Sequence, residues 1–77
     1  MTTVRYFAAA QDAAGVEAEA LEASTLGDLR ARLTADHPGL AGILDRCALL
    51  VDGRRVDDGF ALAGVETVDV LPPFAGG

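Results

Sequence analysis

Hydrophobic and polar residues alternate at the start of the chain, over residues 2–8. Val4 and Tyr6 fall on one face of this stretch, and Arg5 and Phe7 fall on the other. A period of two residues is typical of a β-strand that buries one of its faces. We therefore expect a strand here, with Val4 and Tyr6 facing the core.

The alternation resumes at Val16, after an alanine-rich stretch over residues 8–15 that ends in a glycine. Glu17 and Glu19 are expected on the solvent side of this second strand. The two strands would form an antiparallel hairpin, in which residues 8–15 are an unusually long loop.

A helical pattern covers residues 24–39. Leu26, Leu29 and Leu33 are spaced so that their side chains share one face of a helix. Thr25 stands where its hydroxyl group can cap the first turn, and a proline and a glycine at the end of the stretch stop the helix.

Two further strands are expected within residues 47–56, joined by Asp52 and Gly53. An Asp-Gly pair between two strand-like runs is a strong signal for a tight β-hairpin. The last strand is expected over residues 66–71, where alternating valines face the core and Leu71 faces away from it.

These elements predict an α+β fold, a mixed sheet of four to five strands covered by one main helix. Their order is that of the β-grasp, or ubiquitin-like, fold. The chain has 77 residues, which is enough for a single core. We expect one domain over residues 1–71, followed by an extended tail over residues 72–77 with a flexible Gly-Gly end.

Composition narrows the classes of partner. The net charge is −6 and all six basic residues are arginine, so no nucleic acid partner is expected and a basic protein partner is favoured. The apolar runs are far shorter than the ~20 residues of a membrane helix, so we expect a cytoplasmic protein without membrane contact. The single cysteine, Cys47, can form neither an internal disulfide nor a metal cluster by itself, and no metal site is expected.

Four segments carry a specific resemblance: RYFAAAQDAAG, TLGDLRARL, LLVDGRRV and, above all, the ending LPPFAGG. Over essentially its whole length the chain resembles the small subunit of molybdopterin synthase and related ubiquitin-like sulfur carriers. It departs from that pattern before the last strand, where residues 63–66 replace the acidic, glycine-containing turn common in these proteins.

The resemblance implies a non-catalytic carrier whose reacting group is the C-terminal carboxylate of Gly77. A ubiquitin-activating-type adenylyltransferase would adenylate that carboxylate with ATP. A sulfur donor such as a cysteine desulfurase or a rhodanese would then supply sulfur for a thiocarboxylate. The large subunit of molybdopterin synthase would receive the tail and pass the sulfur to a cyclic pyranopterin during molybdenum cofactor biosynthesis. The implied carrier binds no permanent cofactor.

The residues of the tail suit insertion into the pocket of another protein. Prolines lack N–H donors and end a strand, and glycines have no Cβ to obstruct a narrow channel. Activation is needed, because an α-carboxyl group is ionised at neutral pH and is then a poor electrophile. The expected insertion residues are Pro72, Pro73, Phe74, Ala75 and Gly76.

A docking surface is expected beside the tail. If the first and last strands are parallel neighbours, Phe7 and Leu71 lie together on the outer face of the sheet. An exposed apolar cluster next to a reactive end is a candidate partner surface, and Arg54, Arg55 and Phe74 are its candidate rim contacts.

Two alternatives stay open at this stage. The same chemistry can deliver sulfur to thiamine, cysteine or tRNA, or can attach the chain to protein lysines as a modifier. A different class is a β-grasp interaction module whose C-terminus is chemically inert.

Overall fold

The computed structural model of the chain describes residues 1–73, which form five strands, two α-helices and two 3-10 helices. The strands are β1 (Thr2–Tyr6), β2 (Ala18–Leu21), β3 (Ala48–Val51), β4 (Arg54–Arg55) and β5 (Thr67–Leu71). The helices are α1 (Ala9–Ala14), α2 (Leu26–Asp36), η1 (Pro38–Leu40) and η2 (Leu44–Arg46).

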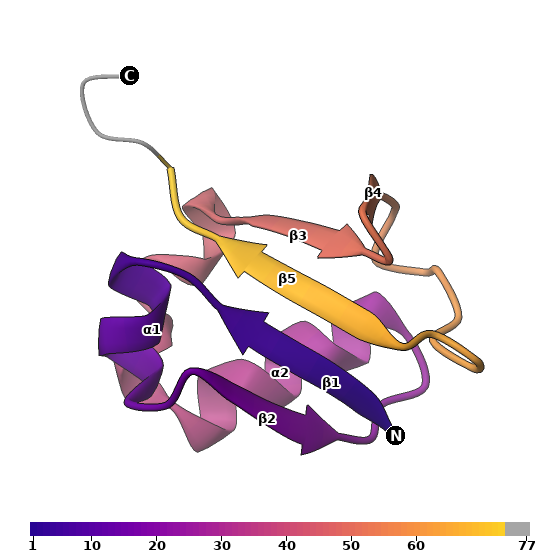
Figure 1. Cartoon of the computed structure of the whole chain (residues 1–77), viewed down its shortest axis with the longest axis horizontal. Coiled ribbons are helices and arrows are strands. Elements are labelled where there is room, and N and C mark those ends of the chain that lie inside the picture. The colour runs from indigo at the N-terminus through magenta and orange to yellow at the C-terminus, as the bar shows by residue number, and fades with distance from the viewer. Residues whose placement is uncertain (74–77) are drawn as a thin grey trace.

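The five strands form one mixed sheet in the order β2-β1-β5-β3-β4. The central pair, β1 and β5, is parallel, and the other three pairs are antiparallel. The helices lie together on one face of the sheet, so the opposite face is open (Figure 1). This is the β-grasp arrangement that the sequence predicts.

The core fills the space between the sheet and α2. In the parallel pair, Val4 is opposite Val68 and Tyr6 is opposite Val70, and all four side chains are buried. The predicted alternation of β1 and β5 is therefore confirmed. Full burial of a valine or leucine side chain contributes about 1.5–3 kcal/mol relative to exposure.

Helix α2 begins and ends as the sequence predicts. The Thr25 hydroxyl oxygen accepts a hydrogen bond from the backbone N–H of Asp28 at 3.1 Å, which satisfies one of the free donors of the first turn. Leu26, Leu29 and Leu33 are all buried against the sheet, as their spacing requires.

The stretch between β1 and β2 is more structured than the loop expected there. It contains the six-residue helix α1, which ends at Gly15 in a left-handed conformation, with φ 80°. Helix α1 packs against η1, where a Cβ at Gly39 would lie only 2.8 Å from the carbonyl oxygen of Ala13. The close approach of the two backbones therefore requires glycine at this position.

The face of β2 differs from the sequence prediction at Glu19. Leu21 is buried, and Glu19, two residues before it, lies on the same inner side of the strand. The carboxylate accepts a hydrogen bond from the Tyr6 hydroxyl group at 2.6 Å, and His37 Nε2 contacts the same oxygen. The prediction that Glu19 faces solvent is wrong, because Leu21 fixes the register and two polar partners make an inward carboxylate tolerable.

The ionisation of Tyr6, the sole tyrosine, can be used to test its contact with Glu19. Burial raises the pKa of Tyr6, and its hydrogen bond to Glu19 raises it further. In the unfolded chain the phenol ionises near pH 10, so folding stability falls as the pH rises above about 10. The chain has no tryptophan, and a titration of phenolate absorbance in the native and urea-unfolded states therefore measures the shift.

We expect the native phenol to stay neutral at a pH where the unfolded phenol is mostly ionised. The matched variant Glu19→Gln removes the charge but keeps the size of the side chain, and the native transition should move part of the way back toward pH 10. Identical native and unfolded titrations would contradict this placement of Tyr6.

Candidate functional site: the sheet edge from which the tail leaves

The described part of the tail leaves the sheet beside the end of β1. Because β1 and β5 are parallel, both strands end at the same edge of the sheet (Figure 1). Pro72 is buried against the fold and Pro73 is exposed. The remaining tail residues named in the sequence prediction, residues 74–77, lie outside the described residues.

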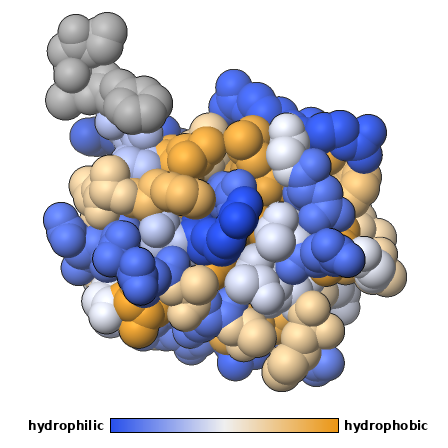
Figure 2. Space-filling view, in the orientation of Figure 1, coloured by the Kyte–Doolittle hydropathy of each residue, from blue (hydrophilic) through white to orange (hydrophobic). Residues whose placement is uncertain are grey.

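An apolar cluster borders this exit on the open face of the sheet. Phe7 follows β1, and its backbone N–H donates to the carbonyl oxygen of Val70 at 3.2 Å, which places it beside Leu71. Leu71 is opposite Ala48, and Leu50 lies on the same face of β3. Hydrophobic side chains gather at this end of the sheet in Figure 2. We call Phe7, Ala48, Leu50 and Leu71 the exit patch.

The exit patch is accessible to a partner. Phe7 is 39 % exposed and is one of three large hydrophobic side chains exposed in the described part of the chain. Ala48, Leu50 and Leu71 are half-buried. The structure thus brings together Phe7 and Leu71, as strand parity predicts.

The chain turns sharply after Phe7. The carbonyl oxygen of Phe7 accepts a hydrogen bond from the N–H of Ala10 at 3.0 Å, and Ala8 between them has φ 50° and ψ −124°. These angles belong to the first central position of a type II′ turn, which favours glycine. A non-glycine residue in such a conformation stores about 1–3 kcal/mol of strain, and this strain lies next to the exit patch.

The two arginines of the β3–β4 hairpin lie on opposite faces of the sheet, because successive side chains alternate along a strand. Arg55 is opposite Leu50 and therefore shares the open face with the exit patch. Arg54 is opposite the buried Val51 and lies on the other side of the strand. Of these two arginines, Arg55 alone is thus on the face that carries Phe7 and Leu71, and the third candidate rim contact, Phe74, lies outside the described residues.

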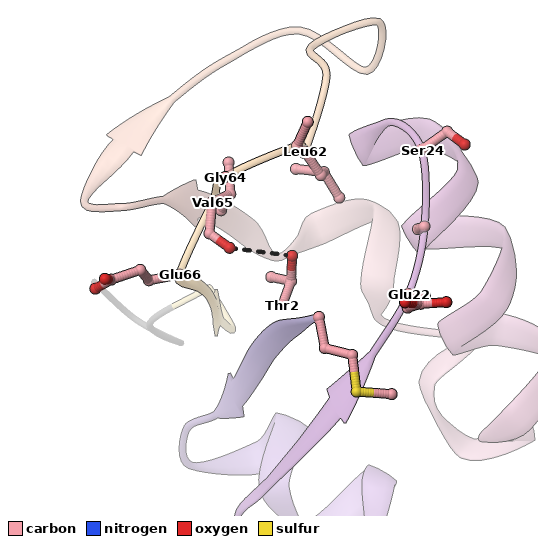
Figure 3. A pocket seen from close by; sticks show the side chains of 10 residues that line it. Thr2, Glu22, Ser24, Leu62, Gly64, Val65 and Glu66 are labelled. Atoms are coloured by element: carbon pink, nitrogen blue, oxygen red, sulfur yellow. Dashed lines mark hydrogen bonds between the residues drawn. The ribbon is translucent and has the colours of Figure 1, made fainter.

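A shallow groove opens at the other end of the sheet and is a weaker candidate site. It lies between the segment after β2 and the loop before β5, with Glu22 and Glu66 at its margin (Figure 3). Inside it, the Thr2 hydroxyl group donates to the carbonyl oxygen of Val65 at 3.3 Å. Among the described residues no group of three His, Cys, Asp or Glu side chains is arranged to hold a metal ion.

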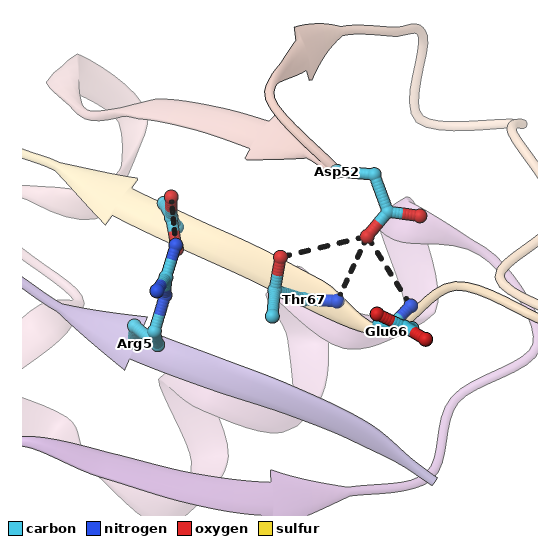
Figure 4. Close-up of polar contacts among 5 residues, drawn as sticks. Arg5, Asp52, Glu66 and Thr67 are labelled. Atoms are coloured by element: carbon cyan, nitrogen blue, oxygen red, sulfur yellow. Dashed lines mark hydrogen bonds and ion pairs between the residues drawn. The ribbon is translucent and has the colours of Figure 1, made fainter.

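Asp52 links the β3–β4 turn to the start of β5 at the far end of the open face. It accepts hydrogen bonds from the backbone N–H groups of Glu66 and Thr67 at 3.2 and 3.0 Å (Figure 4). Both Asp52 and Gly53 have positive φ, 46° and 84°, as a type I′ hairpin turn requires. The hairpin was predicted from the sequence, but this contact with the start of β5 was not.

Arg5 and Asp69 form an ion pair in the middle of the open face. Arg5 Nε lies 2.6 Å from Asp69 Oδ1, and Arg5 Nη2 lies 2.8 Å from Asp69 Oδ2 (Figure 4). The hydrogen bond to Asp69 raises the pKa of Arg5. The guanidinium carbon also lies 5.9 Å from the centre of the Phe7 ring, so the pair adjoins the exit patch. Neither residue was predicted from the sequence to belong to the site, although their positions on facing strands make such a pair possible.

Cys47 is not placed for nucleophilic chemistry. Its thiol is buried and donates to the carbonyl oxygen of Ile43 at 3.3 Å. Burial raises the pKa of this thiol, so the neutral form is favoured. None of the helices within residues 1–73 has the length and apolar character needed to cross a membrane.

Comparison with known proteins identifies the family. The model of the ThiS family matches residues 4–77, nearly the whole chain. The chain belongs to the ThiS family. It is a ubiquitin-like protein of the sulfur carrier type. None of the curated proteins matches the chain.

Solved structures agree with this fold. SAMP1 from Haloferax volcanii matches with a TM-score of 0.85 and 24% identity, over 99% of this chain and 98% of that chain. A Pyrococcus furiosus protein assigned as molybdopterin converting factor subunit 1 matches with a TM-score of 0.82 and 24% identity, over 95% and 97% of the two chains. The Haloferax volcanii HVO 2177 protein is 33% identical, with a TM-score of 0.73, over 99% of this chain and 85% of its own.

The strained turn at Ala8 gives a direct test of the local backbone. Ala8→Gly removes the steric cost of positive φ but adds flexibility to the unfolded chain. We expect a net gain of about 1 kcal/mol in the free energy of unfolding, measured by urea denaturation. The matched change Ala9→Gly, in the first turn of α1, should instead lower stability by about 0.5–1 kcal/mol. Equal losses from both changes would show that Ala8 is not strained.

Proposed function

We propose that this ThiS-family protein is the sulfur carrier subunit of molybdopterin synthase. Its C-terminal glycine, Gly77, would be adenylated and then converted to a thiocarboxylate that donates sulfur to a cyclic pyranopterin precursor. The observation that carries the proposal is the coincidence of the LPPFAGG ending with an exposed apolar patch at the edge where β5 ends.

The chemistry is divided between the carrier and its partners. The carboxylate of Gly77 would attack the α-phosphate of ATP on a ubiquitin-activating-type adenylyltransferase, and pyrophosphate would leave. In the resulting acyl-adenylate AMP is a good leaving group, so the terminal sulfur of a persulfide on a cysteine desulfurase or a rhodanese can displace AMP from the carbonyl carbon. A thiol would then reduce the acyl disulfide, which releases the thiocarboxylate and forms a disulfide with the donor's cysteine. The carrier contributes the reacting carboxyl group, and the large synthase subunit contributes the final active site.

The features near the tail support this division of roles. Pro72 and Pro73 directly follow β5, and a proline cannot extend the hydrogen-bonded ladder of a strand. The exit patch offers an exposed apolar surface against which a partner can orient the segment that follows. The likeness to a molybdopterin converting factor subunit supports the fold of such a carrier.

A second candidate function is a ubiquitin-like protein modifier. It is supported by the structural match to small archaeal modifier protein 1, which extends over 95% of this chain at 21% identity. Both functions begin with an activated C-terminus. They differ in the acceptor, which is sulfur in one case and a protein lysine in the other.

Intact mass measurement tests the carrier chemistry. After incubation with its adenylyltransferase, ATP and a sulfur donor, the chain should gain the mass difference between one sulfur and one oxygen atom. Deletion of Gly77 should abolish the gain while thermal unfolding is unchanged. Conjugates to lysine side chains in place of this gain would favour the modifier function, and an unmodified chain beside an active enzyme would contradict both functions.

Mutation of the exit patch tests docking separately from the tail. Phe7→Ser removes an exposed apolar contact, and we expect affinity for the large synthase subunit to fall about tenfold or more, as for a central interface residue. Stability should change little, because Phe7 lies outside the buried core. Val16→Ser, which also changes an exposed apolar residue, is the control. An equal effect of both changes on affinity would exclude the patch as the docking site.

A further inference from the structure

The open face of the sheet differs in charge from the chain as a whole. Its outward strand positions carry two arginines, Arg5 and Arg55, and one aspartate, Asp69. The chain as a whole has a net charge of −6. Two arginines against one aspartate leave these outward strand positions with one net positive charge, beside the exit patch of an acidic protein.

These charges lie in one row across four strands. Arg5 is opposite Asp69, Asp69 is opposite Leu50, and Leu50 is opposite Arg55. The next row toward the tail is apolar and contains Phe7, Leu71 and Ala48. The two arginines are thus the two ends of a row that adjoins the exit patch and shares Leu50 with it.

Arg5 covers the one carboxylate in this row. The side chain of Asp69 is 15% exposed, whereas that of Arg5 is 49% exposed. Asp69 engages Nε and Nη2 of Arg5, which leaves the other guanidinium donors accessible. A partner approaching the face therefore meets the guanidinium group before it meets the carboxylate.

Arg55 adds a second accessible guanidinium group. Its residue is exposed, and the ion pairs among residues 1–73 do not include it. Apart from Asp69, the acidic groups that the structure describes near this row lie toward the margins of the face. Glu17 borders a shallow hollow beside Arg5 and Phe7, and Asp52 is held at the far end by hydrogen bonds to the start of β5.

We propose that Arg5 and Arg55 make this face selective for a protein surface with an apolar centre and carboxylates at its margin. The proposal rests on the carrier function above and names the chemistry of the docking partner. Guanidinium groups bind carboxylates in a planar, paired geometry. The sequence-based expectation of a basic partner follows from net charge alone, whereas this face favours the opposite sign.

The distribution of charge also helps to orient the carrier relative to an acidic partner. The acidic remainder of the carrier repels carboxylates, and the open face attracts them, so an acidic partner is directed to the side from which the tail leaves. Charge complementarity of this kind acts mainly on encounter and specificity. The two arginines are therefore expected to affect binding of the partner and not the chemical step.

Steady-state kinetics of adenylation test the proposal with the full chain, ATP and the adenylyltransferase of the same organism. Arg55→Glu should raise the KM for the carrier about tenfold with little change in kcat, as expected for one lost close charge pair. Arg55→Lys should recover most of the loss. Arg32→Glu is the control, because it changes net charge equally but lies on α2, where Arg32 pairs with Asp36.

A charge swap separates recognition by Arg5 from a structural role. The double variant Arg5→Asp with Asp69→Arg keeps an ion pair between β1 and β5 but presents a carboxylate at the more exposed position. We expect thermal unfolding close to that of the wild type and a KM still raised about tenfold.

The outcomes distinguish this proposal from the carrier function. Failure of the wild-type chain to be adenylated would overturn the carrier function, and the proposal with it. Normal adenylation of the wild type with an unchanged KM in Arg55→Glu and in the swap would overturn the selectivity alone. A raised KM in Arg55→Glu together with a wild-type KM in the swap would show that Arg5 and Asp69 only hold the strands together, and would overturn the role of Arg5.

Discussion

The parallel pairing of β1 with β5 is the constraint on which the rest of the structure depends. It joins the first strand of the chain to the last at the centre of the sheet, and it aligns Val4 with Val68 and Tyr6 with Val70. Parallel strands end at the same edge, so the start of the tail necessarily lies beside the residue that follows β1. The position of Phe7 next to Leu71 is thus a consequence of the same register that builds the core.

Because side chains alternate along these strands, one face of the sheet packs the core and the other is available to a partner. Inward side chains pack against α2 and determine stability, whereas outward side chains of the same strands form the exit patch and the Arg5–Asp69 pair. A slip of one residue would exchange the two sets, which makes the register strongly specified. Because exposed ion pairs contribute only about 0–1 kcal/mol, the outer face can be shaped by partner recognition with little effect on folding.

Much of this arrangement could be predicted from the sequence, because strong periodicity and turn chemistry are local signals. The faces of β1 and β5, the leucine stripe of α2 and the turn at Asp52 and Gly53 are examples. Helix α1 was missed because six residues, four of them alanine, show no apolar stripe and lack a side-chain cap. Glu19 was misplaced because its partners, Tyr6 and His37, are 13 and 18 residues away, and alternating alanines and glutamates do not fix a register.

The distinction between local sequence signals and strand register also applies to the candidate site. Phe7 and Leu71 could be identified from strand parity, but the assignment of Arg55 to the open face and Arg54 to the other side required the register of β3 with β4. Net charge is a property of composition, whereas recognition depends on the few square nanometres that a partner contacts. An acidic protein can therefore present guanidinium groups on its docking face, provided that the carboxylate at the centre of that face, here Asp69, is covered by one of them. That requirement explains why the pair belongs at the centre of the face, where a bare carboxylate would oppose both the apolar contact and the approach of an acidic partner.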